Sequence, residues 1–137
     1  MAYSSFENLE VWRRACDLAV EICREVADMR LFALRNQLQR AVISIPSNIA
    51  EGSERDSTGD FVRFLRIAKG STAELRTQLI IATRLGLISD EFSARATDEA
   101  RQIGAMLQGL IRSLGSSSLK DESGYLPVHD NPLDEAE

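Results

Sequence analysis

The fold is decided by residues 61–82, which read FVRFLRIAKGSTAELRTQLIIA. Apolar and small residues recur in this stretch at alternating steps of four and three positions: Phe61, Leu65, Ala68, Thr72, Leu75, Leu79 and Ala82. Such a heptad seam is typical of a long helix that packs against other helices. Ser57-Thr58-Gly59-Asp60 has the form of a capping box, and Gly86 suits the end of a helix. The pattern therefore predicts one helix between Ser57 and Gly86.

Similar patterns lie on both sides of this stretch. After it, Ser89-Asp90-Glu91 suits a helix start and Gly115 an end, with a seam at Ala96, Ala100, Ile103, Leu107, Leu110 and Leu114. Before it, a helical segment that ends near Gly52 has its apolar residues at Leu31, Leu34, Leu38, Ala41, Val42, Ile45 and Ile49. The first segment carries a stripe of Leu9, Trp12, Cys16, Ala19, Ile22 (or Cys23), Val26 and Met29, flanked by Val11, Ala15 and Leu18.

Pro46 lies inside the second segment, where it removes a backbone donor and clashes with the carbonyl of Val42. The helix either kinks or breaks there, and the apolar pattern that continues through Ile49 favours a single kinked helix. Short linkers make successive helices antiparallel neighbours. The sequence therefore predicts an all-α protein, an antiparallel up-down-up-down four-helix bundle over residues 1–115, with helix two kinked at Pro46.

The net charge of −5 belongs to the C-terminal end of the 137-residue chain. Residues 116–137 hold six acidic residues against one lysine, whereas the first 115 residues are neutral. We expect residues 116–137 to form an acidic disordered tail, because they contain few large apolar residues. No apolar run approaches the length of a membrane span, and the N-terminal residues lack the pattern of a secretion signal. A cytoplasmic protein that does not bind membranes is expected.

Two short apolar runs exceed what one bundle needs, since a bundle helix buries about three positions per heptad. Residues 41–45 and 79–82 supply apolar side chains around the whole helix, which favours self-association into a homo-oligomer. The candidate oligomer interface consists of Val42, Ile43, Ile45, Ile80 and Ile81. Alternatively, Ile43 and Ile80 are scattered surface residues of an ordinary kind. Gly70, in a run of small residues, costs helix stability relative to alanine, and we expect it to allow close approach of two helices; the alternative is a weak position that the helix tolerates.

The residues offer no catalytic or metal-binding constellation. His129 is the only histidine, so a histidine-based triad or a histidine-rich metal site is excluded. Cys16 and Cys23 lie two helical turns apart and cannot bond to each other, and we expect them to be buried. No glycine-rich phosphate loop is present. We therefore predict no enzyme, no cofactor, no metal and no identifiable small-molecule substrate.

A set of polar residues is predicted to form a structural hydrogen-bond layer between helices: Ser44, Ser47, Asn48, Glu51, Ser71 and Glu74. The first four recur at helical spacing and share one face. The alternative is that they line a ligand site or the central opening of an oligomer. Glu51 and Glu74 are expected to pair with arginines such as Arg40, Arg55 or Arg76, because an unpaired buried carboxylate is costly.

Three stretches resemble a known family. They are FENLEVW at 6–12, QLQRAVISIPSNIAEG at 37–52 and FLRIAKGSTAEL at 64–75. They resemble the four-helix bundle proteins encoded within 23S rRNA intervening sequences, and the resemblance covers residues 3–115. It implies a bacterial, cytoplasmic, non-catalytic homopentamer shaped like a ring. A related branch comprises accessory proteins of diversity-generating retroelements, which bind nucleic acid through a basic surface.

Two functions follow as hypotheses. The first is a homopentameric scaffold of unknown cellular role. The alternative is an accessory protein that binds RNA or DNA through a ring of basic residues: Arg55, Arg63, Arg66 and Lys69. The neutral body and the acidic tail weigh against this alternative, because nucleic-acid binders usually carry an excess of basic residues.

Overall fold

The structure is a computed structural model that describes residues 5–121, and side chains up to residue 115. A 3-10 helix, η1 (Phe6–Asn8), precedes α1 (Glu10–Glu25), α2 (Phe32–Ser53), α3 (Thr58–Arg84) and α4 (Asp90–Asp121), and the described residues form no strand. The prediction of an all-α protein with four long helices is confirmed. Within residues 5–121, no helix is both long and apolar enough to span a membrane.

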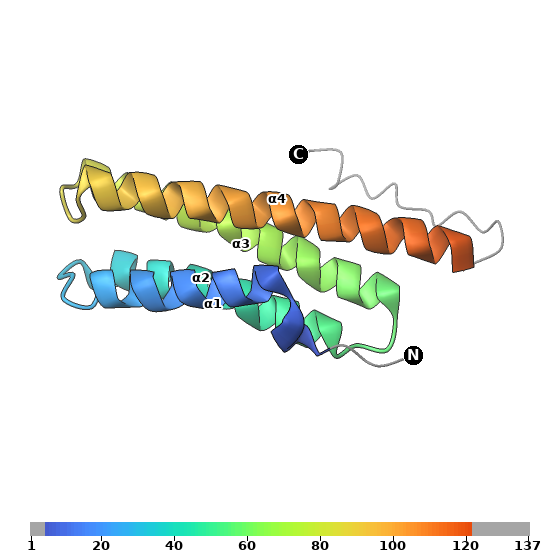
Figure 1. Cartoon of the computed structure of the whole chain (residues 1–137). Helices are drawn as coiled ribbons and strands as arrows, with labels where there is room; N and C mark the ends of the chain where they lie inside the picture. Colours follow the sequence, from blue (N-terminus) through green and yellow to red (C-terminus); the bar gives the residue numbers. More distant parts are fainter. Residues whose placement is uncertain (1–4, 122–137) are drawn as a thin grey trace.

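The four helices pack side by side around a common core (Figure 1). α1 contacts α2 and α4, while α3 contacts α2 and α4. The three connecting loops lie alternately at the two ends of the molecule (Figure 1). The heptad seam of α3 provides much of the core: all of its members are buried except Phe61, which is half-buried.

The core face of α1 differs from the predicted stripe. The side chains that α1 buries include Val11, Ala15 and Leu18, which the sequence placed on its flank, whereas Trp12 and Cys16 are only half-buried. The helix also ends at Glu25, before the predicted stripe does, although Val26 and Met29 are buried in the loop that follows. Because the apolar face of α1 is wide, the sequence alone did not fix its centre.

Hydroxyl caps start the last two helices as predicted. The Ser57 side chain accepts a hydrogen bond from the Asp60 backbone N–H at 3.1 Å, and Ser89 accepts one from the Phe92 N–H at the same distance. At the other end of α3, Gly86 adopts φ of +72°, and the Leu87 N–H donates to the Ala82 carbonyl. A residue with a side chain is strained at such a φ, so the predicted role of Gly86 at the helix end is confirmed.

α2 is a single helix that runs through the buried Pro46. The break that the proline made possible is therefore absent, and the kink stays a prediction. α2 ends at Ser53, beside the predicted end near Gly52, but Gly52 itself lies inside the helix and does not terminate it. Gly52 is buried where α2 meets α3, and a Cβ there would lie 2.6 Å from the Phe64 Cβ. Its small size is needed for close packing, not for a turn.

The expected role of Gly70 is also wrong. This glycine is exposed, and a Cβ at its position would meet no atom within 4 Å. The close approach between α3 and α4 occurs instead at Gly104, where a Cβ would lie 3.2 Å from the Thr72 Oγ1. Thr72 can face the partner helix because its hydroxyl donates to the Lys69 carbonyl at 2.6 Å, which satisfies it within α3.

The last helix is longer than expected, because α4 continues past Gly115 to Asp121. The division into a bundle over 1–115 and a tail over 116–137 stays a prediction. The remainder of the predicted acidic tail, with His129, lies outside the described residues.

Candidate functional site

Half of the predicted polar layer forms a compact cluster between α2 and α3. The hydroxyls of Ser44 and Ser71 are 2.9 Å apart. The Asn48 amide donates to both the backbone carbonyl and the hydroxyl of Ser44, at 2.8 and 2.9 Å. Ser71 is almost fully buried, so this cluster satisfies polar groups that the helix contact removes from water. A structural layer is what these three residues provide.

The other predicted members of this layer lie outside it. Ser47, Glu51 and Glu74 are exposed. Glu51 pairs with Arg55 one turn further along, at 3.1 Å, which confirms the expected arginine partner. Glu74 lines a small surface pocket with Arg40 and Ser44. The layer is therefore smaller than predicted. Helical spacing shows which residues share a face of α2, but not which of them are covered by α3.

The candidate oligomer interface divides into buried and exposed residues. Val42 and Ile45 are 0% exposed and belong to the core of the single chain, so their assignment to an interface is wrong. They have no surface left for a second copy. Ile43, Ile80 and Ile81 are 49%, 46% and 44% exposed, so each presents apolar surface to the outside.

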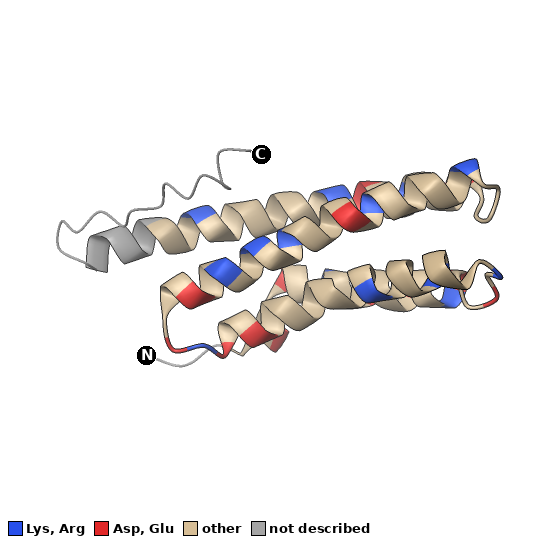
Figure 2. Ribbon diagram, turned by 180° about the vertical axis from the view of Figure 1, so that it is seen from behind, with Lys and Arg blue, Asp and Glu red and all other residues tan. Residues whose placement is uncertain are grey.

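Sequence reasoning missed further exposed apolar residues at one end of the molecule. Phe32 stands at the start of α2, and Leu85 and Leu87 follow α3, all with substantial exposure. Leu31, which the sequence assigns to the apolar stripe of the second helix, is also exposed, because α2 begins only after it. The α1–α2 and α3–α4 loops that adjoin these residues lie at the same end in both views (Figures 1 and 2).

Two of the predicted nucleic-acid contacts are engaged within the chain. Arg55 and Arg63 both place their guanidinium groups over the Phe64 ring, with the Cζ atoms 4.7 and 4.6 Å from its centroid. Both also have carboxylate partners, since Arg55 pairs with Glu51 and Arg63 with Asp60. Their charges are partly compensated, and Figure 2 shows both signs of charge spread along the bundle. The other two predicted contacts, Arg66 and Lys69, line a surface groove between α3 and α4.

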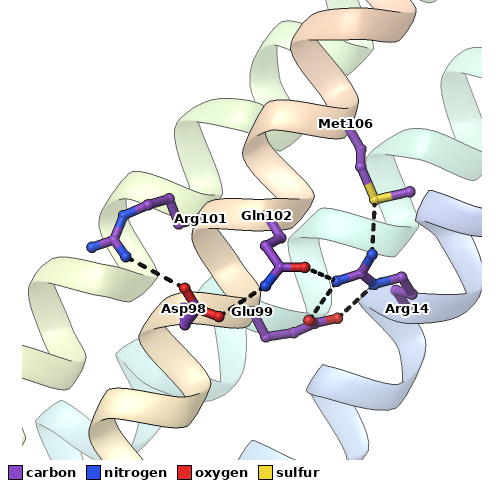
Figure 3. A network of polar contacts seen from close by, with 6 residues as sticks. All are labelled: Arg14, Asp98, Glu99, Arg101, Gln102 and Met106. Carbon is purple, nitrogen blue, oxygen red and sulfur yellow. Dashed lines mark hydrogen bonds and ion pairs between the residues drawn. The ribbon is translucent and has the colours of Figure 1, made fainter.

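The most connected polar network joins α1 to α4 and has no counterpart in the sequence predictions (Figure 3). The Arg14 guanidinium donates to both carboxylate oxygens of Glu99, at 2.9 and 2.6 Å, and to Gln102 at 2.7 Å. Gln102 in turn donates to Asp98 at 2.8 Å. The hydrogen bonds that Arg14 donates to the Glu99 carboxylate raise the pKa of Arg14 above its ordinary value. Arg14 and Glu99 are 85 residues apart, so no local spacing could indicate this pair.

The two cysteines are free and half-buried, which is less burial than expected. Burial raises the pKa of both thiols, and the charge of Asp17 adds to the effect at Cys16. A raised pKa lowers the thiolate fraction, which is the opposite of what a nucleophile needs. Across the described part of the chain, no three histidine, cysteine, aspartate or glutamate side chains gather as a metal site would require.

Comparison with known proteins places this geometry in a family. The structure is similar to the crystal structure of a protein of unknown function from the S23 ribosomal protein family of Bacteroides thetaiotaomicron, with a TM-score of 0.70 and 26% sequence identity over 74% of this chain and 97% of that one. Among proteins of curated function, none matches. The family model of the 23S rRNA-intervening sequence proteins matches residues 7–109, most of the four-helix region. The chain therefore belongs to the 23S rRNA-intervening sequence protein family.

Proposed function

We propose that the protein is a non-enzymatic, cytoplasmic scaffold that assembles into a ring-like homopentamer. Each subunit is an antiparallel up-down-up-down bundle with α2 kinked at Pro46, and the alternation of the loops between the two ends supports this arrangement (Figure 1). The observation that carries the proposal is the apolar surface that one chain leaves exposed at Ile43, Ile80 and Ile81.

Further apolar surface is exposed next to the α1–α2 and α3–α4 loops. Phe32 is 61% exposed and Leu85 is 56% exposed. Proteins rarely leave extensive apolar patches in water, and a second copy of the same chain is a common way to cover them. Five copies is the number that the family resemblance implies.

The mass of the particle in solution tests the proposal. Sedimentation equilibrium of the full chain should give about five times the chain mass of 15.2 kDa. Ile80→Asp should dissociate the particle, because a carboxylate buried in an apolar contact without a partner is strongly unfavourable. Val20→Asp is the matched control, since Val20 is an exposed apolar residue on α1 outside the candidate interface. A wild-type chain that sediments as a monomer at every concentration would contradict the proposal.

A second candidate function, binding of RNA or DNA by an accessory protein, is favoured by one observation. Arg66 and Lys69, two of the predicted contacts, line a groove whose described lining contains no acidic residue. Repetition of this groove around a ring would sum into a stronger positive field. Affinity for single-stranded RNA should then fall steeply as salt rises, and absence of binding at ~50 mM salt would remove this candidate.

A further inference from the structure

The groove between α3 and α4 has the composition of an anion site. It has a volume of about 250 Å³ and is lined by three cationic residues of α3: Arg66, Lys69 and Arg76. Among the described residues of its lining, none is acidic, and the others are small or short.

The hollow exists because small residues alternate with the long cationic ones. Arg66, Lys69, Ala73 and Arg76 follow one another at steps of three and four residues, so they share one face of α3. A Cβ at Gly70 would meet no atom within 4 Å, and the space beside it is therefore open. On the opposite wall, Gly104 of α4 has no side chain to fill the groove.

Two cationic residues of this groove use only part of their hydrogen-bonding capacity within the described structure. The Nε of Arg76 is buried and has no hydrogen-bond partner within the described structure. Lys69 Nζ donates one hydrogen bond to Gln108 Oε1 at 2.7 Å, whereas an ammonium group has three donors. Lys69 therefore keeps donors for a bound ligand, and the cationic residues that line the groove favour a ligand that is negatively charged.

We propose that this groove binds a phosphate group. A phosphate offers several acceptor oxygens and a negative charge, and arginine can donate to two of these oxygens with its planar guanidinium. Lys69 and Arg76 are about 10 Å apart along the helix axis, so their side chains can converge on one phosphate above Gly70 and Ala73. All lining residues come from one chain, so a phosphate can bind to a single subunit. The proposal is therefore independent of the pentamer.

A titration with inorganic phosphate tests the site. Backbone amide spectra of the full-length, isotopically labelled protein are recorded while sodium phosphate replaces sodium chloride at constant ionic strength. The amides of Gly70 and Gly104 should shift in a saturable manner. Arg76→Gln should weaken binding by about tenfold, which is the expected effect of losing one charge-assisted contact.

Two further variants distinguish a specific phosphate site from nonspecific electrostatic attraction of the anion. Gly70→Leu keeps every charge and places a side chain in the groove, so phosphate should bind at least about tenfold more weakly. The fold should be retained, because leucine is a better helix former than glycine. Arg84→Gln removes the same charge as Arg76→Gln from an exposed position at the end of α3, and should leave affinity within about twofold. Shifts that grow without saturation, or equal affinities of the Arg76→Gln and Arg84→Gln variants, would overturn the proposal.

A second arm with a short oligouridine identifies the source of the phosphate. If the oligonucleotide competes with phosphate for the Gly70 and Gly104 amides, the groove accepts the phosphates of a nucleic-acid backbone. If phosphate saturates these amides and the oligonucleotide leaves them unchanged, the ligand is a small phosphorylated molecule. Failure of both probes to shift these amides would overturn the site.

Discussion

Gly52 is a single residue whose missing side chain sets how closely α2 and α3 approach. A Cβ at this position would lie 2.6 Å from the Phe64 Cβ and 3.0 Å from the Phe61 Cδ1. Because Phe64 Cβ is next to the backbone, the helices would have to move apart. We expect Gly52→Ala to lower the free energy of unfolding by about 1–3 kcal/mol, measured by chemical denaturation.

Gly109→Ala is the control for this prediction. Gly109 is an exposed residue inside α4, and a Cβ there would meet no atom within 4 Å. Alanine is the better helix former by up to about 1 kcal/mol, so this variant should be at least as stable as the parent chain. If both variants were equally stable, Gly52 would not be the point of close contact.

The two cysteines give a prediction about reactivity and pH. Burial raises the pKa of both thiols, so few thiolates form near neutral pH. At pH 8, we expect an aromatic disulfide reagent to react at least about tenfold more slowly with the folded protein than with the chain in denaturant. The neutral thiols favour the folded state below their ordinary pKa, and this stability is lost as pH rises through the raised pKa.

Asp17→Asn serves as the internal comparison for the thiols. It removes the charge that adds to the raised pKa of Cys16, whereas burial alone accounts for Cys23. Cys16 should then react faster and Cys23 at an unchanged rate, which mass spectrometry of the modified peptides distinguishes. Reaction of both thiols at the denatured rate in the parent protein would show that the raised pKa values do not protect them.

Glycines also show how far the sequence predicts single residues. Gly86 was identified at a helix end because a seam stops before it, and its φ of +72° agrees. The roles of Gly52 and Gly70 were not predicted correctly. A glycine that a close helix contact requires and a glycine that lies at an exposed helix position cannot be distinguished by sequence alone. Only the neighbours on another helix, Phe64 in one case and open space in the other, distinguish them.

At the scale of helices, the predictable ion pairs are those within one helix. Glu51–Arg55 follows from a spacing of four residues, but such exposed pairs contribute little to stability. The pair that connects two helices, Arg14–Glu99, depends on how α1 and α4 are placed side by side (Figure 3). That placement is a property of the packed bundle, which explains why the sequence did not reveal the network.

A double-mutant cycle on Arg14 and Glu99 measures this contact. Both side chains are less than one-third exposed, and two hydrogen bonds join them. We expect Arg14→Met and Glu99→Gln to be coupled by about 1 kcal/mol in the free energy of unfolding. The same cycle on Arg13 and Glu10, an exposed pair three residues apart, should give about 0.3 kcal/mol. Equal couplings in the two cycles would mean that the α1–α4 network adds nothing beyond a surface pair.

At the scale of the whole molecule, the seams predicted the bundle but not which apolar residues remain outside it. The heptad pattern located α3 and most of its core face, because such periodicity is repeated over many residues. Within the run 41–45, however, Val42 and Ile45 face the core and Ile43 does not. A dense apolar run indicates surplus surface without showing which side chains provide it, since that depends on the rotation of α2 in the bundle.

If the chain assembles through its exposed isoleucines, Ile43, Ile80 and Ile81, the stability of the folded state should depend on protein concentration. If five unfolded chains arise from each particle, a tenfold rise in protein concentration stabilises the folded state by roughly 1.1 kcal/mol per chain. For a chain of this length, this raises the midpoint of thermal unfolding by about 3–4 °C, which scanning calorimetry resolves. Ile80→Asp should remove the dependence because it disrupts the contact between copies, whereas Val20→Asp should retain it. A wild-type midpoint that stays constant over about a hundredfold range of concentration would mean that unfolding and assembly are independent, and the exposed isoleucines would then be ordinary surface residues.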